Sequence, residues 1–157
     1  MSGSKQHLDG KTCLITGATN GIGRVTAVEL AGMGAELFLT YRDKARADAT
    51  IAEIRQKTGN DKIHLLKADL GSQSQVRVAA AEFLATGKPL HVLINNAGLG
   101  NTSKTITAEG IETVFAVKPP RLFPADDVAA LLYQAQRAGA DCECCFGSAS
   151  LLNDQFR

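Results

Sequence analysis

A run of glycines between an apolar segment and a helical pattern constrains this chain more than any other feature. Residues 11–16 form a short apolar segment typical of a β-strand, and the sequence Gly17-Ala-Thr-Asn-Gly-Ile-Gly23 follows it directly. Glycines at these positions let the backbone turn tightly and let a phosphate group approach without a Cβ in the way. A helix that begins there adds unpaired N–H groups and the positive end of its dipole. Such a turn can also simply pack a helix on a strand, but the strand before it and the helix after it favour a pyrophosphate-binding turn.

The rest of the pattern predicts an α/β fold with a parallel sheet. Apolar residues recur at helical spacing from Val25 to Met33, where Gly34 ends the first helix. Three further strands are predicted at 37–41, 63–67 and 91–94, and two further helices at 44–57 and from Ser72 to about Ala85. Strands that alternate with helices of this length are typical of right-handed βαβ units. We therefore expect an α/β fold with a parallel sheet of about four strands in the order βαβαβαβ, preceded by a polar extension at residues 1–10.

Composition excludes several other classes of protein. Of the 157 residues, 45% are hydrophobic and the formal net charge is +1, which excludes an intrinsically disordered chain. A nucleic-acid binder would usually carry a basic stripe, so the near-neutral charge argues against a nucleic-acid partner. No segment approaches the roughly 20 apolar residues of a transmembrane helix, and residues 1–10 lack the apolar core of a secretion signal. The expectation is a cytoplasmic protein with no nucleic-acid partner and no transmembrane segment.

A second motif, Asn-Asn-Ala-Gly at residues 95–98, follows the fourth predicted strand. Small residues there leave room for a ligand above the carboxyl edge of the sheet, where open α/β folds bind their ligands. Together the two motifs resemble the short-chain dehydrogenase/reductase family, and the pair Asp69-Leu70 after the third strand fits the same pattern. The resemblance covers residues 11–117, and the Tyr-Arg-Asp run at 41–43 is similar to the retinol-dehydrogenase-like and protochlorophyllide-reductase-like branch.

The resemblance implies a Rossmann-like doubly wound parallel sheet, incomplete in this chain, and hydride transfer between a nicotinamide cofactor and an alcohol or carbonyl group. The organisation that it implies is a partial dinucleotide-binding domain at 11–117, followed by an irregular, atypical tail at 118–157. The resemblance places one set of residues around the pyrophosphate and the adenosine ribose, a second beside the adenine, and a third beside the adenosine and nicotinamide riboses. In that order, the sets are Gly17, Thr19, Asn20, Gly21, Ile22 and Gly23; Asp69 and Leu70; and Asn95, Ala97 and Gly98. Intact relatives often form oligomers, through helices that are missing from this sequence.

The charge at the end of the second strand bears on the choice of cofactor. An NAD site has a carboxylate there that accepts the ribose 2′-hydroxyl, whereas this chain has Tyr41 followed by Arg42. A guanidinium holds a phosphate bidentately, so the sequence favours NADP(H) over NAD(H). Two features count against this: Asp43 is adjacent to Arg42, and Asn20 stands where many NADP-preferring relatives carry a second basic residue. Arg42 as a solvated surface charge remains the alternative interpretation.

The resemblance ends after Val117. The family continues with Asn-His-x-Gly on a helix and, further on, with a catalytic serine and Tyr-x-x-x-Lys. This chain continues with Lys118-Pro-Pro-Arg121, which is incompatible with a helix interior, and it contains no Tyr-x-x-x-Lys. The nearest imitation pairs Tyr133 with Arg137, whose guanidinium stays protonated near neutral pH. We therefore assign no catalytic residue and expect a chain that keeps the dinucleotide-binding half without turnover.

A one-base shift of the reading frame near residues 117–118 would explain the tail. Codons exist for residues 118–124 that, with one base removed, encode Asn-His-Leu-Gly-Tyr-Phe, as the family pattern requires. Codons for residues 137–146, read one base later, encode a segment similar to the strand that leads to the family's catalytic serine. The hypothesis is therefore a truncated or frameshifted family member.

The same hypothesis accounts for the cysteine cluster Cys142-Glu-Cys-Cys145. Thiols packed so closely along the chain cannot easily present tetrahedral geometry, so no metal ligand is assigned. Two alternatives stay open. In one, the chain is a non-enzymatic nucleotide-binding or regulatory module whose tail forms a partner surface; in the other, the tail completes an active site with Tyr133.

Overall fold

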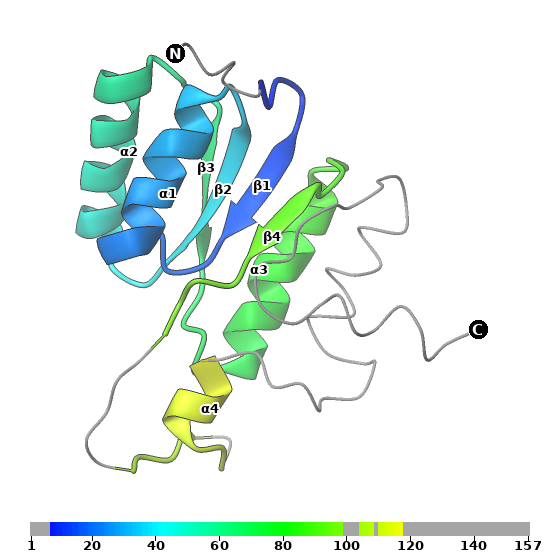
Figure 1. Ribbon diagram of the computed structural model, residues 1–157. Coiled ribbons are helices and arrows are strands. Elements are labelled where there is room, and N and C mark those ends of the chain that lie inside the picture. The colour runs from blue at the N-terminus through cyan, green and yellow to red at the C-terminus, as the bar shows by residue number, and fades with distance from the viewer. Residues whose placement is uncertain (1–6, 99–103, 109, 118–157) are drawn as a thin grey trace, which may run out of the picture.

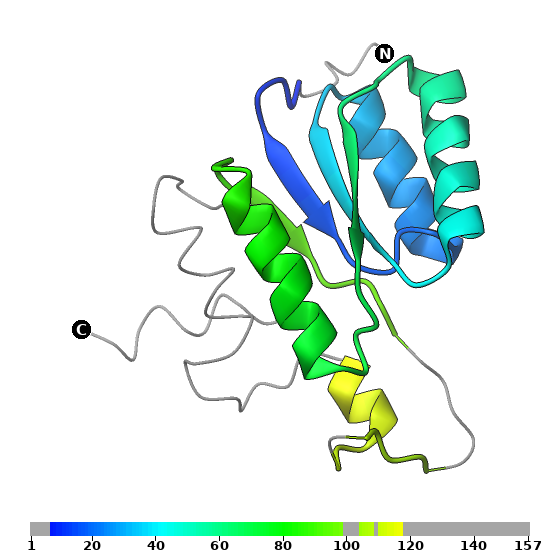
Figure 2. The ribbon, with the colours of Figure 1, turned by 180° about the vertical axis from the view of Figure 1, so that it is seen from behind.

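The computed structural model describes residues 7–98, 104–108 and 110–117. Within them, one sheet holds parallel strands in the order β3-β2-β1-β4, which are β1 (Thr12–Ile15), β2 (Glu36–Tyr41), β3 (Ile63–Lys67) and β4 (Val92–Ile94). Helices α1 (Gly21–Gly32) and α2 (Lys44–Thr58) cover one face, and α3 (Gln73–Ala85) covers the other (Figure 1, Figure 2). A short helix, α4 (Thr113–Val117), follows at the lower end of α3 in Figure 1. The expected α/β class and parallel four-strand sheet are confirmed.

The sheet separates two apolar clusters. Along β1, Cys13 and Ile15 pack on the side of α1 and α2, whereas Leu14 packs on the side of α3. This alternation follows from the two-residue period of a strand. The rings of Phe38 and Phe83 meet edge to face at 4.8 Å and join β2 to α3. Because β1 and the middle of β2 are covered on both faces, they are apolar almost throughout, which is the pattern expected of central parallel strands.

Helix α1 forms where the sequence predicts it, but it packs through its smallest residues. Its buried positions are Gly23, Ala27 and Ala31, which share one face at a spacing of four residues. Val25, which belongs to the apolar pattern of the sequence, is 59% exposed. Small residues on the buried face allow the helix axis to lie close to the sheet, and this close approach is what the larger apolar residues would prevent.

The helix ends follow local signals in the sequence. Asp43 is the N-cap of α2, and Gly59, at φ 70°, ends that helix in the left-handed conformation that glycine adopts readily. Ser72 occupies the N-cap position of α3, but its hydroxyl makes no capping hydrogen bond with the helix. The predicted ends at residues 57 and 85 therefore lie within one residue of the observed ones.

Part of the predicted N-terminal extension packs against the fold. The N–H of Leu8 donates to the carbonyl oxygen of Met33 at 2.7 Å, and the Leu8 side chain joins the cluster under α1. The tail at 118–157, with Tyr133 and the cysteine cluster, lies outside the described residues. In the part of the chain that the structure describes, no helix has both the length and the apolar character needed to cross a membrane.

Candidate cofactor site

The residues predicted to hold a cofactor come from four separate places in the sequence and meet at one edge of the sheet. They follow β1, β2, β3 and β4, whose carboxyl ends all point to the lower edge in Figure 1. Helices α1 and α2 begin at this edge, so their positive dipole ends lie there as well. This is the edge at which open α/β sheets bind ligands.

Hydrogen bonds join the glycine turn after β1 to the segment after β4. The side-chain amide of Asn96 donates to the carbonyl oxygens of Thr16 and Gly17, each at 3.1 Å. The N–H of Ala97 donates to Oγ1 of Thr16, also at 3.1 Å. Asn96 and Thr16 were not among the predicted site residues. Their partners lie about 80 residues away in the sequence, so the only local signal was the repeated asparagine of the motif.

Two glycines of the turn are required by close approaches. Gly17 has φ +66°, and a Cβ there would lie 2.9 Å from Cα of Ala97. A Cβ on Gly23 would lie 2.3 Å from Nδ2 of Asn96 and 2.5 Å from the carbonyl oxygen of Gly17. The glycine run therefore does what the packing interpretation requires. It also leaves positions 17, 21 and 23 around the start of α1 without a Cβ.

The first turn of α1 offers backbone donors at the same edge. Asn20 is the N-cap, and its Oδ1 accepts a hydrogen bond from the N–H of Gly21 at 2.8 Å. Among the described residues, the N–H groups of Ile22 and Gly23 have no hydrogen-bond partner. Unpaired N–H groups at a helix start, together with the helix dipole, suit an anion such as a phosphate.

The end of β2 carries Arg42, which is exposed and forms no ion pair with another described residue. The Asp43 side chain caps the start of α2. Its Oδ1 accepts a hydrogen bond from the N–H of Arg46 at 3.2 Å. Its Oδ2 lies 3.4 Å from Nε of the same arginine. The carboxylate that counted against a phosphate in the sequence is thus a helix cap with a cation beside it.

After β3, Asp69 is held by its own loop. Its Oδ1 accepts from the N–H of Gly71 at 2.9 Å, and its N–H donates to Oε1 of Gln75 at 3.0 Å. Leu70 is half-buried and packs against the cluster on the α3 side of the sheet. Between α3 and the sheet lies a cavity of about 40 Å³, lined by Leu14, Thr16, Thr40, Leu66, Ala68, Leu70, Val76, Ala79 and Ala80.

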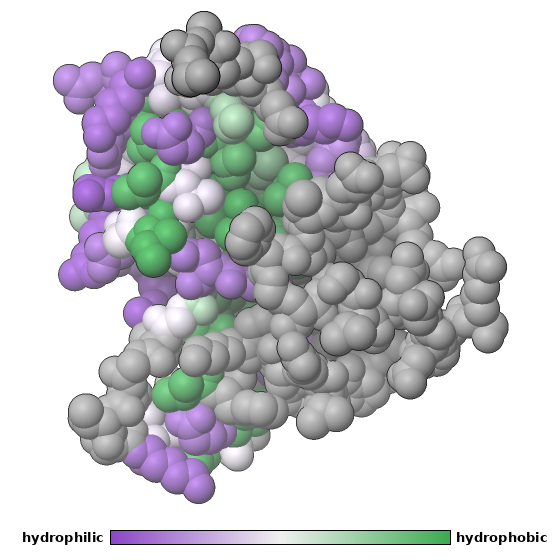
Figure 3. Space-filling model, viewed as in Figure 1, coloured by the Kyte–Doolittle hydropathy of each residue, from purple (hydrophilic) through white to green (hydrophobic). Residues whose placement is uncertain are grey.

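Exposed apolar side chains flank the glycine turn. Ile22 is 79% exposed and Val25 59% exposed, both at the start of α1. Figure 3 shows apolar surface over α1 and the strands beside it, whereas the surface over α2 is mostly hydrophilic. Exposed apolar surface therefore lies at the first turns of α1, beside the glycine turn.

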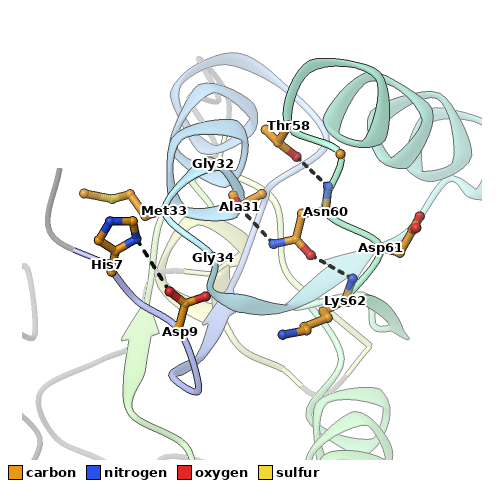
Figure 4. Close-up of a pocket in the computed structure, with 11 residues that line it drawn as sticks. His7, Asp9, Ala31, Gly32, Met33, Gly34, Thr58, Asn60, Asp61 and Lys62 are labelled. Atoms are coloured by element: carbon orange, nitrogen blue, oxygen red, sulfur yellow. Dashed lines mark hydrogen bonds and ion pairs between the residues drawn. The ribbon is translucent and has the colours of Figure 1, made fainter.

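A larger hollow, of about 530 Å³, lies at the opposite edge of the sheet (Figure 4). It is lined by His7, Asp9, Ala31, Gly32, Met33, Gly34, Thr58, Gly59, Asn60, Asp61 and Lys62. The Asn60 side chain forms part of the wall of this hollow. Its amide donates to the carbonyl oxygens of Ala31 and Ala35, each at 2.9 Å. None of the predicted cofactor residues lies there. This hollow is larger than the cavity between α3 and the sheet.

The comparisons with known proteins follow this geometry. A family model described as short chain dehydrogenase matches residues 11–122. The chain belongs to this family. The match reaches five residues beyond the predicted limit at Val117, and it confirms the resemblance drawn from the two motifs. The predicted similarity to retinol dehydrogenases is confirmed by the curated relatives.

Among those relatives, retinol dehydrogenase 12 from Mus musculus is 42% identical over 111 residues, which cover 71% of this chain and 35% of that protein. Retinol dehydrogenase 11 from Homo sapiens is 43% identical over 109 residues, which cover 69% of this chain and 34% of that protein. The chain thus spans about a third of the length of these curated relatives.

Solved structures agree on the fold. A short-chain dehydrogenase from Sphingobium yanoikuyae in complex with NADPH superposes with a TM-score of 0.61 and 32% identity, covering 80% of this chain and 46% of that one. A metagenomic short-chain oxidoreductase in complex with NADP gives a TM-score of 0.64 and 28% identity, covering 83% of this chain and 57% of that one.

Proposed function

We propose that this short-chain dehydrogenase chain binds a nicotinamide dinucleotide at the carboxyl edge of its sheet. The observation that carries the proposal is the glycine turn bound to Asn96, which leaves the N–H groups of Ile22 and Gly23 unpaired at the start of α1. A pyrophosphate fits such a start because no Cβ stands in its way and the helix dipole attracts it. The residues that we propose to surround the cofactor are Gly17, Thr19, Asn20, Gly21, Ile22, Gly23, Arg42, Asp69, Leu70, Asn95, Ala97 and Gly98.

We further propose that NADP(H) binds in preference to NAD(H). Arg42 stands at the end of β2 without an ion-pair partner among the described residues, so its guanidinium is available to a 2′-phosphate. Asp43 opposes this less than the sequence suggests, because it caps α2 and pairs with Arg46. The relatives from Sphingobium yanoikuyae and the metagenome, solved with NADPH and NADP, support the same preference.

The proposed role in catalysis is limited to the cofactor. A bound nicotinamide supplies or accepts a hydride, and in the family an alcohol or carbonyl group is its partner. The 157 residues contain no Tyr-x-x-x-Lys, so we propose that this polypeptide by itself turns over no substrate. The shifted reading frame remains our explanation for the tail. If sequencing of the coding DNA finds no family pattern after removal of one base near codons 117–118, that explanation is wrong.

Titration of the chain with NADPH and NADH, followed by nucleotide fluorescence, tests the proposal. We expect NADPH to bind more tightly, and we expect Arg42→Gln to weaken NADPH binding about tenfold with little change for NADH, the size of one charge-assisted contact to phosphate. Arg55→Gln is the matched control, because Arg55 pairs with Asp61 at the far end of α2. Binding of neither nucleotide, or tighter binding of NADH, would contradict the proposal, and carbonyl reduction above a buffer blank would contradict inactivity.

A further inference from the structure

The junction between β2 and α2 carries a charge pattern that does not suit a helix start. Acidic residues are favourable near the positive end of a helix dipole and basic residues are unfavourable. The first turn of α2 has no acidic residue, yet it holds Lys44 and Arg46, and Arg42 precedes it. Apart from the N-cap Asp43, the charges at this end are therefore basic, and they suit an anion better than they suit the helix dipole.

Asp43 is the one acidic residue between positions 42 and 46, and its carboxylate is bound by Arg46. The Asp43 carboxylate accepts a hydrogen bond from the Arg46 N–H at 3.2 Å and lies 3.4 Å from the guanidinium Nε. Lys44 does not share this task, because its ammonium pairs with Asp48 one turn further along α2. Arg46 therefore binds Asp43 with both its backbone and its side chain.

We propose that Arg46 determines cofactor specificity by neutralising Asp43, so that the end of β2 accepts a 2′-phosphate beside Arg42. The inference rests on the proposed function, because it concerns the same nucleotide. Arg42 and Asp43 are consecutive, so their Cα atoms lie about 3.8 Å apart, and an unscreened carboxylate there would repel a phosphate bound by Arg42. Arg46 acts through Asp43 and is a positioning residue, not a contact to the nucleotide.

The charge of Asp43 and its capping role can be separated by substitution. Asparagine is as good an N-cap as aspartate, so Asp43→Asn keeps the cap of α2 and removes the negative charge. Arg46→Gln keeps the backbone N–H that the cap uses and removes only the guanidinium. Arg46→Lys restores the positive charge. All three variants therefore keep the backbone cap of α2 and alter only the charge interaction between Arg46 and Asp43.

The experiment is a double-mutant cycle on the full 157-residue chain, with NADPH and NADH titrated against each protein. We expect Arg46→Gln to weaken NADPH binding about three- to fivefold, the size of an exposed charge interaction, and to change NADH binding less than about twofold. In the Asp43→Asn background the same substitution should change NADPH binding less than about twofold. Arg46→Lys should recover most of the affinity for NADPH.

Two results would overturn the inference while leaving the proposed function intact. Equal weakening of NADPH binding by Arg46→Gln in both backgrounds would mean that Arg46 contacts the phosphate directly. Equal weakening for NADPH and NADH would mean that the substitution only disturbs α2. Arg55→Gln is the control for loss of an exposed arginine from this helix, and thermal unfolding of each variant checks that α2 remains folded. Failure of the wild-type chain to bind either nucleotide would overturn the proposed function itself, and the inference with it.

Discussion

The carboxyl and amino edges of the sheet share an asparagine bridge and nearby glycines, but helices begin at one edge and end at the other. At each edge an asparagine amide bridges two backbone carbonyl oxygens: Asn96 joins Thr16 to Gly17, and Asn60 joins Ala31 to Ala35. Glycines stand beside both. At the carboxyl edge α1 and α2 begin, whereas at the amino edge, around the hollow of Figure 4, both helices end.

The direction of the helices decides which edge suits an anion. Helix starts present N–H donors and positive dipole ends, whereas helix ends present carbonyl acceptors and negative ones. At the amino edge the Asn60 amide donates to the carbonyl oxygen of Ala31, in the last turn of α1, and to that of Ala35, directly before β2. The Oδ1 of Asn60 accepts from the N–H of Lys62 at 2.8 Å. The larger hollow is therefore a structural junction, and the carboxyl edge, where α1 and α2 begin, is the better candidate for a dinucleotide.

The largest expected effect comes from filling the closest approach at the carboxyl edge. Gly23→Ala would place a Cβ 2.5 Å from the carbonyl oxygen of Gly17 and 2.3 Å from the Asn96 amide. We expect a loss of about 1–3 kcal/mol of unfolding free energy, as for other overpacked sites. We also expect at least about tenfold weaker NADPH binding, because the turn that meets the pyrophosphate must shift. Urea unfolding and NADPH titration measure the two effects.

Gly32→Ala is the matched control for that substitution. It lies at the other end of the same helix, and a Cβ there would be 3.6 Å from Cγ2 of Thr58, an ordinary van der Waals distance. Because alanine is a better helix former than glycine, stability should stay the same or rise by up to about 1 kcal/mol, with unchanged NADPH binding. Equal losses of binding in both variants would break the distinction between the two edges.

The two asparagines provide the next comparison. Asn96→Ala and Asn60→Ala each remove a side chain that bonds two carbonyl oxygens, so each should cost about 1–3 kcal/mol of unfolding free energy. Only Asn96→Ala should also weaken NADPH binding, by about tenfold, because it frees the glycine turn from β4. Denaturant unfolding gives the first quantity and fluorescence titration the second. A loss of binding in Asn60→Ala as large as in Asn96→Ala would show that the two edges are not independent.

Local signals predicted most of the fold. The glycines after α1 and α2, the cap at Asp43 and the apolar strand segments all act over a few residues. The sequence alone therefore placed the four strands, α2 and α3 within one or two residues, whereas it did not predict α4. The buried face of α1 was harder to predict, because helices usually bury their larger apolar residues. Here Ala27 and Ala31 are buried and Val25 is exposed, since the helix lies close to the sheet.

The interior of the site was less predictable because its contacts are distant in the sequence. The carbonyl partners of Asn96 lie 79 and 80 residues earlier, and no local pattern distinguishes Asn96 from Asn95. Asp43 was predicted to oppose phosphate binding, because the sequence shows it next to Arg42. The sequence does not show that the Asp43 carboxylate pairs with Arg46, because that pairing depends on side-chain geometry. The spacing of three residues between an N-cap carboxylate and an arginine is the signal that would have suggested it.

The smallest expected effect is the contribution of Glu36, at the amino edge, to the unfolding free energy, a contribution that is lost in acid. Glu36, the first residue of β2, lies 2.7 Å from Nε2 of His64 and 2.8 Å from Nζ of Lys88. Burial of this carboxyl would raise its pKa, but the hydrogen bonds from Lys88 and His64 outweigh burial and hold the pKa of Glu36 below its ordinary value of 4.5. The ionised form therefore favours the folded state.

It follows that Glu36 stabilises the fold above pH 4.5 and that this contribution is lost as the pH falls through the lowered pKa of the folded state. We expect Glu36→Gln to lower the unfolding free energy at pH 7 by about 1 kcal/mol or less and to flatten its decline below pH 4.5. NADPH affinity at pH 7 should not change, because Glu36 stands at the edge away from the glycine turn. Urea unfolding as a function of pH measures the first effect. If the unfolding free energy of the variant depends on pH as in the wild type, Glu36 does not contribute to the acid sensitivity. Weaker NADPH binding by the variant would show that a charge at the amino edge affects binding at the carboxyl edge.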